Sequence, residues 1–266
     1  MKKLLNLLII TLFMTSCSEK AQKVLILYYS QTGVTKTVAT ELQAQTGADI
    51  CSFDVVQPYD GTFDETIQRC LGEQQRGFVP PLAPLGCDLS QYDVVFLGYP
   101  IWFGTYATPV KALLETEDFA GKTVVPFSTF GSGGLQPSVA DLREALPAAL
   151  VKNGYGVREA RLYAIQDELN RFLIENGWKA GEIKPLPDYS EETPVTEDEA
   201  AVFHAACDSY QFPLGVPVTC GSRQTDSSTD YVFTARNVNE DGTASVSKIY
   251  VTVISGRSPE FTQVVR

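Results

Sequence analysis

The sequence predicts a three-layer α/β domain, with a parallel β-sheet between two layers of helices, followed by a smaller α+β unit. Two observations predict this fold class. Short apolar runs alternate with segments of helical spacing from residue 22 to about residue 181, a pattern typical of parallel sheets covered by helices on both faces. The alternation then stops, and a stretch rich in proline and acidic residues precedes one helix and a group of short strands.

The first unit begins with an unbroken apolar run at residues 24–29, which is typical of a strand buried on both faces of a parallel sheet. Residues 35–45 have helical spacing, with Val38, Ala39 and Leu42 on one face. The remaining expected strands are residues 49–55, 94–98, 123–127 and 158–164, and the remaining expected helices are residues 108–114, 137–150 and 167–176.

The second unit begins with capping-box spacing at residues 196–199, which predicts a helix through about residue 210. Strands are expected at residues 231–236, 245–253 and 262–264, so that one helix lies on a small antiparallel sheet. The predicted organisation is a signal peptide (1–16), a tether (17–21), an α/β domain (22–182), a linker (183–195) and a small α+β domain (196–266).

The chain has 266 residues and a formal net charge of −11. Such a surface repels nucleic acids and anionic lipid headgroups, so we expect neither a nucleic-acid partner nor a membrane contact made by a basic patch.

The N-terminus predicts export. Lys2 and Lys3 precede an apolar run at residues 4–14, and small residues follow, as in a secretory signal peptide. Residues 14–17 resemble the bacterial lipobox, which implies that Cys17 is acylated and holds the protein on the periplasmic or cell-surface side of a membrane. The alternative is an ordinary secretory signal cut nearby.

The five cysteines other than Cys17 contain no Cys-x-x-Cys pair, and the chain has one histidine. We therefore expect no metal site of the tetrahedral zinc kind. Cys207 and Cys220 are the first candidates for a disulfide outside the cytoplasm. Buried, inert thiols are the alternative.

Three loops that follow predicted strands carry the candidate chemistry. The first opens a helix, and its residues are Ser30, Gln31, Thr32, Gly33, Val34 and Thr35. The start of a helix offers unpaired N–H groups and a positive dipole end, so this loop can seat a phosphate. Hydroxyl groups can add hydrogen bonds, and Gly33 permits a close backbone approach. The alternative is a helix capped by Ser or Thr, with Gly33 as a turn.

The second loop contains Pro100, Ile101, Trp102, Phe103 and Gly104. It lies within residues 99–106, four of which are aromatic. Stacking against a flat conjugated ring would explain this composition, and simple packing on the domain is the alternative.

The third loop contains Thr129, Phe130, Gly131, Ser132, Gly133 and Gly134. Its glycines can present bare backbone groups to a ligand, or they can form a flexible connector. All three loops follow the carboxyl ends of parallel strands, which is the edge where open α/β sheets bind ligands.

Together these loops resemble the flavodoxin family. Residues 30–35 match the flavodoxin phosphate loop, Ser/Thr-x-Thr-Gly-x-Thr, and residues 99–102 and 127–134 are similar to that family's two ring-flanking loops. The resemblance covers about residues 22–181. It implies a flavodoxin-like sandwich with a five-stranded parallel sheet and one non-covalently bound flavin mononucleotide (FMN).

The resemblance also implies roles for individual residues. Residues 30–35 would hold the phosphate, residues 100–104 would border the isoalloxazine ring with Trp102 stacking on it, and residues 131–134 would approach its pyrimidine edge. Many flavodoxins have a tyrosine in the third loop, where this chain has Phe130. One ring face is therefore expected to be open to a substrate or partner.

Three functions follow from these expectations. The first is electron transfer at a membrane surface with a redox partner protein, for which the flavin supplies the chemistry and no catalytic side chain is needed. The second is an FMN-dependent reductase that passes electrons from NAD(P)H to a small quinone-like acceptor. The third is a cofactor-free binding or scaffold protein of the same shape. For the C-terminal unit we expect a partner-binding or dimer-forming module.

Overall fold

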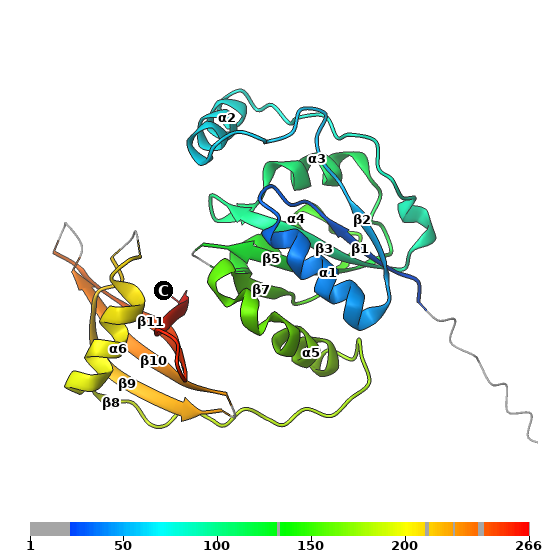
Figure 1. Ribbon diagram of the computed structural model, residues 1–266. Helices are drawn as coiled ribbons and strands as arrows, with labels where there is room; N and C mark the ends of the chain where they lie inside the picture. Colours follow the sequence, from blue (N-terminus) through cyan, green and yellow to red (C-terminus); the bar gives the residue numbers. More distant parts are fainter. Residues whose placement is uncertain (1–21, 132–133, 211–212, 226, 239–241, 266) are drawn as a thin grey trace, which may run out of the picture.

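The computed structural model describes residues 22–131, 134–210, 213–225, 227–238 and 242–265 (Figure 1). The first domain contains a parallel sheet with the strand order β2-β1-β3-β5, which β6 and β7 extend by pairing in succession with β5. These strands are β1 (Val24–Tyr28), β2 (Asp49–Ser52), β3 (Val94–Trp102), β5 (Thr123–Phe130), β6 (Leu150–Val151) and β7 (Tyr155–Arg158). The predicted parallel sheet is confirmed, with its last strand position divided in two.

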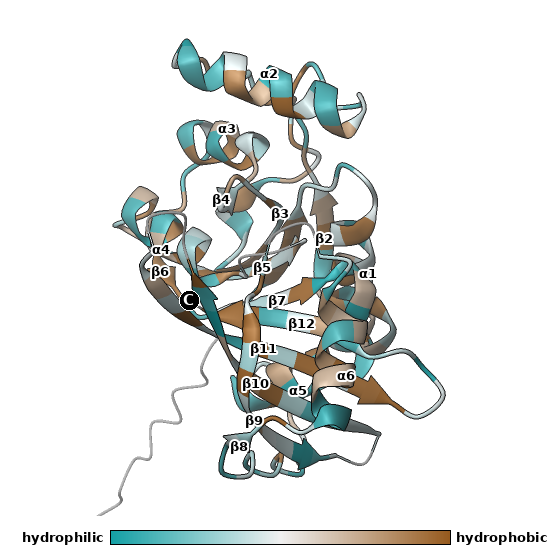
Figure 2. Ribbon diagram, turned by 90° about the vertical axis from the view of Figure 1, so that its left-hand side faces the viewer, coloured by the Kyte–Doolittle hydropathy of each residue, from teal (hydrophilic) through white to brown (hydrophobic). Residues whose placement is uncertain are grey.

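Helices cover both faces of this sheet, as the alternating pattern predicts. Helices α1 (Val34–Thr46) and α5 (Ile165–Glu175) supply Val38, Leu42, Leu169 and other side chains to the core on one face. Helices α3 (Thr108–Thr116) and α4 (Gln136–Ala145) cover the other face. The middle strands are strongly apolar in Figure 2, because both of their faces are buried.

Helix α2 (Phe63–Gln75), which the sequence pattern did not predict, lies beyond α3 in both views (Figures 1 and 2). A capping box begins it, with Thr62 accepting from the Glu65 amide and Glu65 accepting from the Thr62 amide. Cys70 of α2 packs in a small core with Val55 and Tyr59. Its sequence, FDETIQRCLGEQQ, is mostly polar, so it contains few of the apolar residues from which the other helices were predicted.

The last strand of the first domain differs from its prediction. The strand was expected at residues 158–164, but the strand observed is β7 (Tyr155–Arg158), and the residues after it form the 3-10 helix η2 (Glu159–Ala164). Two glycines allow the close approach of β7 to β5: a Cβ atom on Gly154 would lie 2.1 Å from the Pro126 carbonyl oxygen, and one on Gly156 would lie 2.8 Å from the Phe130 ring. The expected helix at residues 137–150 ends at Ala145, and β6 follows it.

The second domain is an antiparallel sheet with the order β12-β11-β10-β9-β8, covered by α6 (Glu197–Cys207). Its strands are β8 (Thr193–Pro194), β9 (Val216–Gln224), β10 (Ser228–Val238), β11 (Ala244–Ile254) and β12 (Glu260–Val265). The predicted combination of one helix and an antiparallel sheet is confirmed. Strand β9 was not predicted, and β8 lies within residues 183–195, where a linker was expected.

Cys207 and Cys220 are free thiols in the core between α6 and the sheet, so the disulfide suggested for them is not formed. Burial raises the pKa of both thiols to about 12, which disfavours the thiolate that disulfide exchange requires. Among the described residues, no helix is long and apolar enough to cross a membrane.

A carboxylate fixes the start of the second domain to its sheet. Glu192 forms an ion pair with Lys248 and accepts hydrogen bonds from Thr219 at 2.7 Å and Thr234 at 2.5 Å. Burial alone would raise the pKa of Glu192, but the hydrogen bonds from Lys248, Thr234 and Thr219 outweigh this effect and lower it to about 2.

The Glu192→Gln variant is expected to be less stable than the parent at pH 7 by roughly 2 kcal/mol, because it loses charge-assisted hydrogen bonds. A lowered pKa stabilises the fold when the group is charged, so this contribution is complete above the ordinary value of 4.5 and fades as the pH falls toward 2. Urea unfolding of both proteins between pH 7 and pH 3 measures the difference. A difference that does not shrink on acidification would contradict the assignment to Glu192.

Candidate functional site

Three loops meet at the carboxyl edge of the first sheet. Strands β1 and β3 pair Tyr28 with Gly98, and β3 and β5 pair Pro100 with Thr129, so the loops after these strands are neighbours. The hydroxyl groups of Thr35 and Thr129 lie 2.8 Å apart and are buried, which joins the first loop to the third. The structure therefore brings together the three segments that were selected from the sequence.

The first loop leaves the start of α1 without a side-chain cap. Gly33 is the N-cap residue, with φ of 92°, and no side chain hydrogen-bonds there as a cap. Ser30 accepts from the Lys36 amide at 3.1 Å, but no group in the described part of the chain accepts from the amides of Val34 and Thr35. No acidic residue lies in the first helical turn. Free N–H groups at a helix N-terminus suit an anion.

The side chains of this loop have different environments. Thr32 is exposed, whereas Thr35 is 1% exposed and its hydroxyl is engaged with Thr129. Gln31 points away from the loop, because its side-chain amide donates to Thr66 of α2 at 2.8 Å. The backbone amides, with the hydroxyls of Ser30 and Thr32, are thus the groups that this loop offers to a ligand.

The second loop is the hairpin between β3 and the short strand β4 (Thr105–Tyr106). Its tip is Phe103-Gly104, and both residues have positive φ, 51° and 83°. Such a conformation is unfavourable for phenylalanine, and strain of this kind is found most often at functional sites. Phe103 is 54% exposed, so its ring is not part of the hydrophobic core.

Trp102 packs inward, unlike Phe103. Its ring lies edge-on to Tyr29, with centroids 5.8 Å apart, and to Tyr59, with centroids 5.1 Å apart. Of the two adjacent aromatic residues, Phe103 is the one with a largely exposed ring, although the sequence favoured Trp102 for stacking. Pro100, Ile101 and Gly104 complete this loop.

The third loop follows β5. Phe130 is half-buried, and Cβ atoms built on Gly131 and Gly134 would meet no atom within 4 Å. The buried Ser128 hydroxyl at the base of this loop has no hydrogen-bond partner in the described part of the structure. Ser132 and Gly133, which belong to the same predicted set, lie outside the described residues.

Two clusters near these loops were not selected from the sequence. In the first, Tyr59 donates to Glu73 at 2.5 Å, and Arg69 lies over the Tyr59 ring at 3.7 Å while pairing with Glu73 at 2.8 Å. Burial and the contact with Glu73 raise the pKa of Tyr59, so its hydroxyl stays protonated. Because Tyr59 contacts Trp102, this cluster supports the second loop.

The second cluster centres on Arg158, which ends β7. Its Nε donates to the carbonyl oxygen of Gly131 in the third loop at 2.9 Å. Burial lowers the pKa of this arginine. The sequence did not identify Arg158 as a loop neighbour, because the predicted strand at residues 158–164 begins at this residue, whereas β7 ends there. Among the described residues, no three His, Cys, Asp or Glu side chains gather as metal ligands.

Comparison with known proteins agrees with this arrangement. A sequence model of the flavodoxin family matches residues 23–173, more than half of the chain. A protein from Bacteroides uniformis, provisionally described as a flavoprotein, is 24% identical over 57% of this chain and 99% of its own, with a TM-score of 0.51. One from Bacteroides eggerthii with the same description is 30% identical over 55% of this chain and 96% of its own, with a TM-score of 0.47.

A flavoprotein from Lactobacillus acidophilus, solved in complex with FMN, is 26% identical over 57% of this chain and 98% of its own, with a TM-score of 0.47. The family match spans the parallel sheet and all three loops at its carboxyl edge. This chain therefore belongs to the flavodoxin family.

Proposed function

We propose that this chain binds FMN non-covalently at the three-loop edge and works as an electron-transfer flavoprotein. The observation that carries the proposal is the uncapped start of α1, where Gly33 has positive φ and the amides of Val34 and Thr35 lack acceptors in the described part of the chain. Neutral dipoles of this kind can hold a phosphate without a lysine or arginine in the loop. The hydroxyls of Ser30 and Thr32 would add hydrogen bonds.

The other two loops fit a flat ring. Phe103 offers an exposed aromatic face, with Trp102 behind it in the same hairpin. Gly131 and Gly134 leave open space where side chains would otherwise stand, so backbone groups can reach the edge of a heterocycle. When bound, FMN would supply the redox chemistry, while these residues orient its ring and exclude water from its covered face.

An absorption spectrum of the purified protein, before and after addition of FMN, tests the proposal. We expect flavin absorbance that stays with the protein through gel filtration, with one FMN per chain. A protein that remains colourless after incubation with FMN would overturn the proposal and would favour the cofactor-free scaffold.

A second candidate is an FMN-dependent reductase that takes electrons from NAD(P)H and passes them to a small quinone-like acceptor. It is favoured by a pocket that borders the third loop at Phe130 and Gly134, where a small molecule could reach the ring. Anaerobic mixing of the FMN-loaded protein with NADH and NADPH separates the two functions. Rapid loss of flavin absorbance identifies a reductase, and unchanged absorbance identifies a carrier that needs a protein partner.

We also propose that the protein is exported and anchored to a bacterial membrane through an acylated Cys17. The support is the lysine pair, apolar run and lipobox-like sequence at residues 2–17, which lie outside the described residues. Metabolic labelling with a radioactive fatty acid should label the parent and leave Cys17→Ser unlabelled. Equal labelling of both would contradict the anchor, and an unlabelled, secreted parent would indicate an ordinary signal peptide.

A further inference from the structure

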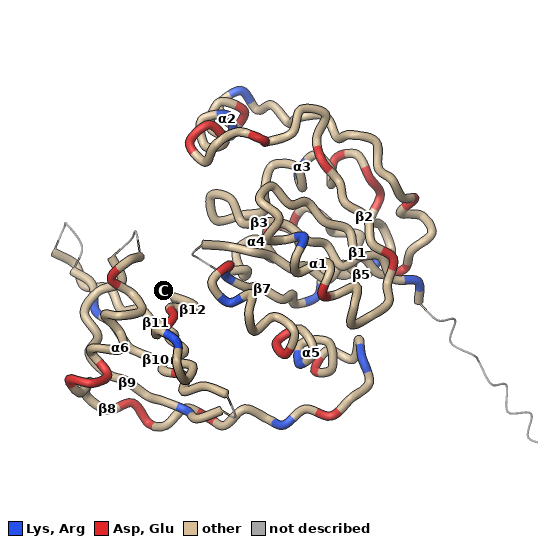
Figure 3. The backbone as a smooth tube through the Cα atoms, in the orientation of Figure 1, with Lys and Arg blue, Asp and Glu red and all other residues tan. Residues whose placement is uncertain are grey.

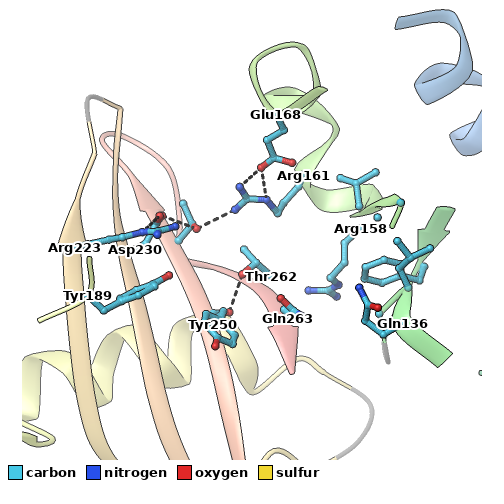
Figure 4. Close-up of a pocket in the computed structure, with 17 residues that line it drawn as sticks. Gln136, Arg158, Arg161, Glu168, Tyr189, Arg223, Asp230, Tyr250, Thr262 and Gln263 are labelled. Atoms are coloured by element: carbon cyan, nitrogen blue, oxygen red, sulfur yellow. Dashed lines mark hydrogen bonds and ion pairs between the residues drawn. The ribbon is translucent and has the colours of Figure 1, made fainter. Parts of the chain in front are cut away.

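The two domains enclose a pocket of about 500 Å³ beside the third loop (Figure 4). The first domain contributes Phe130, Gly134 and residues of β7, η2 and α5, and the second contributes residues of β9 to β12 together with Tyr189. This volume lies within the range of small-molecule sites. Neither domain alone would form the pocket, because each supplies one wall.

The charge of the pocket is opposite to that of the chain. Acidic segments are spread over both domains in Figure 3, and the formal net charge is −11. The pocket, in contrast, has three guanidinium groups and two carboxylates among its lining residues, which are Arg158, Arg161, Arg223, Glu168 and Asp230. A local positive excess inside an acidic protein favours an anionic ligand.

Two of the three arginines are already paired. Arg161 forms an ion pair with Glu168 and donates to Thr252 at 2.9 Å. Arg223 pairs with Asp230 at 3.0 Å. Arg158 has no carboxylate within ion-pair distance in the described part of the structure, and the charge of Glu260 acts on it only from beyond that distance. It is therefore the guanidinium that an anion could pair with.

The hydrogen bonds of Arg158 hold it in place and leave donors unused. Nε donates to the Gly131 carbonyl and Nη1 to the Phe261 carbonyl, so one residue from each domain fixes the side chain. Its Nη2 group makes no hydrogen bond to a described residue. Gln136 and Gln263 lie near Arg158 in Figure 4, and neither carboxamide hydrogen-bonds a described group.

The opposite part of the pocket is aromatic. The rings of Tyr189 and Tyr250 lie edge to face, with centroids 6.2 Å apart, and Arg223 lies over the Tyr189 ring at 4.4 Å. Both tyrosines line the pocket, away from the end that Arg158 occupies (Figure 4). Aromatic side chains of this kind provide flat surfaces for a planar group.

We propose that this pocket binds a small organic anion, whose carboxylate or phosphate is held by Arg158 while its planar ring packs against Tyr189 and Tyr250. The carboxamides of Gln136 and Gln263 complete the anion-binding end. This role goes beyond FMN binding and assigns a purpose to the second domain, which is to close a ligand site next to the third loop. Each N–H to anion hydrogen bond at such a site is stronger than a neutral one.

Calorimetric titration of the full-length protein with three related probes tests the proposal. Naphthoate, naphthyl phosphate and the uncharged naphthamide share one ring system and differ in charge. We expect one anion bound per chain, at least about tenfold more tightly than naphthamide, since a hydrogen bond between charged groups is stronger than one to a neutral amide. The anion with the higher affinity identifies the ligand as a carboxylate or a phosphate. Failure of both anions to bind, or equal binding of naphthamide, overturns the proposal.

Arg158→Gln is expected to weaken binding of the preferred anion about tenfold or more. Arg143→Gln is the matched control, because Arg143 also donates to a backbone carbonyl, that of Val151, and lies outside the pocket. Equal affinity in the parent and Arg158→Gln would overturn the proposal.

A second variant is needed because Arg158 also joins the two domains. Gln263→Ala removes no hydrogen bond within the described structure, and it is expected to lower the affinity for the anion severalfold.

Titration of the same parent protein with FMN, followed by absorbance, separates this proposal from the flavin site. Binding of FMN without binding of either anion would overturn the anion site alone. Binding of an anion without FMN would overturn the flavoprotein function alone and leave the anion site standing.

Discussion

The Gly33→Ala variant is expected to bind FMN roughly 10- to 100-fold more weakly than the parent. Gly33 has φ of 92°, a conformation that costs a residue with a Cβ atom about 1–3 kcal/mol. The variant can relieve this strain only by moving the backbone amides that would hold the phosphate. In addition, a Cβ atom on Gly33 would project into space that is open in the structure, where the phosphate is expected.

The matched control is Gly47→Ala, at the other end of the same helix. Gly47 caps the C-terminus of α1 with φ of 68°, and a Cβ atom there would also meet nothing within 4 Å. Both variants should lose a similar free energy of unfolding, measured with urea, but only Gly33→Ala should lose FMN affinity, measured by titration. A similar loss of FMN affinity in both variants would mean that affinity depends on the stability of α1, and it would contradict a direct role of Gly33 in phosphate binding.

The sequence predicted the arrangement of the loops because it depends on a rule of topology. Parallel strands present their carboxyl ends at one edge, so finding three buried strands was enough to place three loops side by side. The phosphate loop is also local in sequence, and its Gly33 could be interpreted without knowledge of tertiary contacts. The individual side chains were less predictable, because Trp102 and Thr35 turn toward the interior through contacts with Tyr59 and Thr129, which are distant in sequence.

The missed elements share a physical cause, which is that their positions depend on long-range contacts. Helix α2 is mostly polar, and its buried Cys70 packs against Val55 and Tyr59, which lie outside the helix. The pocket between the domains requires Arg158 and Arg161 from one domain and Tyr189 and Arg223 from the other. Hydrophobic periodicity describes which face of an element is buried, but not which other element covers it.

The bounds of strand β7 were also mispredicted because they depend on a contact with another strand, β5. The strand was expected at residues 158–164, and it did not include residues 155–157, where Gly156 lowers the intrinsic preference for a strand. The structure places Gly154 and Gly156 against β5, where larger side chains would collide with Pro126 and Phe130. Arg158 therefore ends the strand and reaches the third loop.

The second large effect is expected for Glu73→Ala, which should lower the free energy of unfolding by roughly 3–5 kcal/mol. Glu73 is 3% exposed, accepts from Tyr59 at 2.5 Å and pairs with Arg69 at 2.8 Å. Removing a buried carboxylate leaves its partners without their hydrogen bonds, which costs far more than the loss of an exposed pair. Urea unfolding at pH 7 measures the change.

Helix α5 contains the control, Glu175→Ala, because Arg171 and Glu175 form a second Arg–Glu pair with the same spacing of four residues. There the glutamate side chain is 50% exposed and the two charged atoms are 3.8 Å apart, so the loss should be below about 1 kcal/mol. The contrast between the variants measures burial together with the hydrogen bond from Tyr59, since residue type, spacing and helical setting are the same. If the two losses were equal, the cluster of Tyr59, Arg69 and Glu73 could not be what holds α2 and Trp102 in place, and the support inferred for the second loop would have to come from elsewhere.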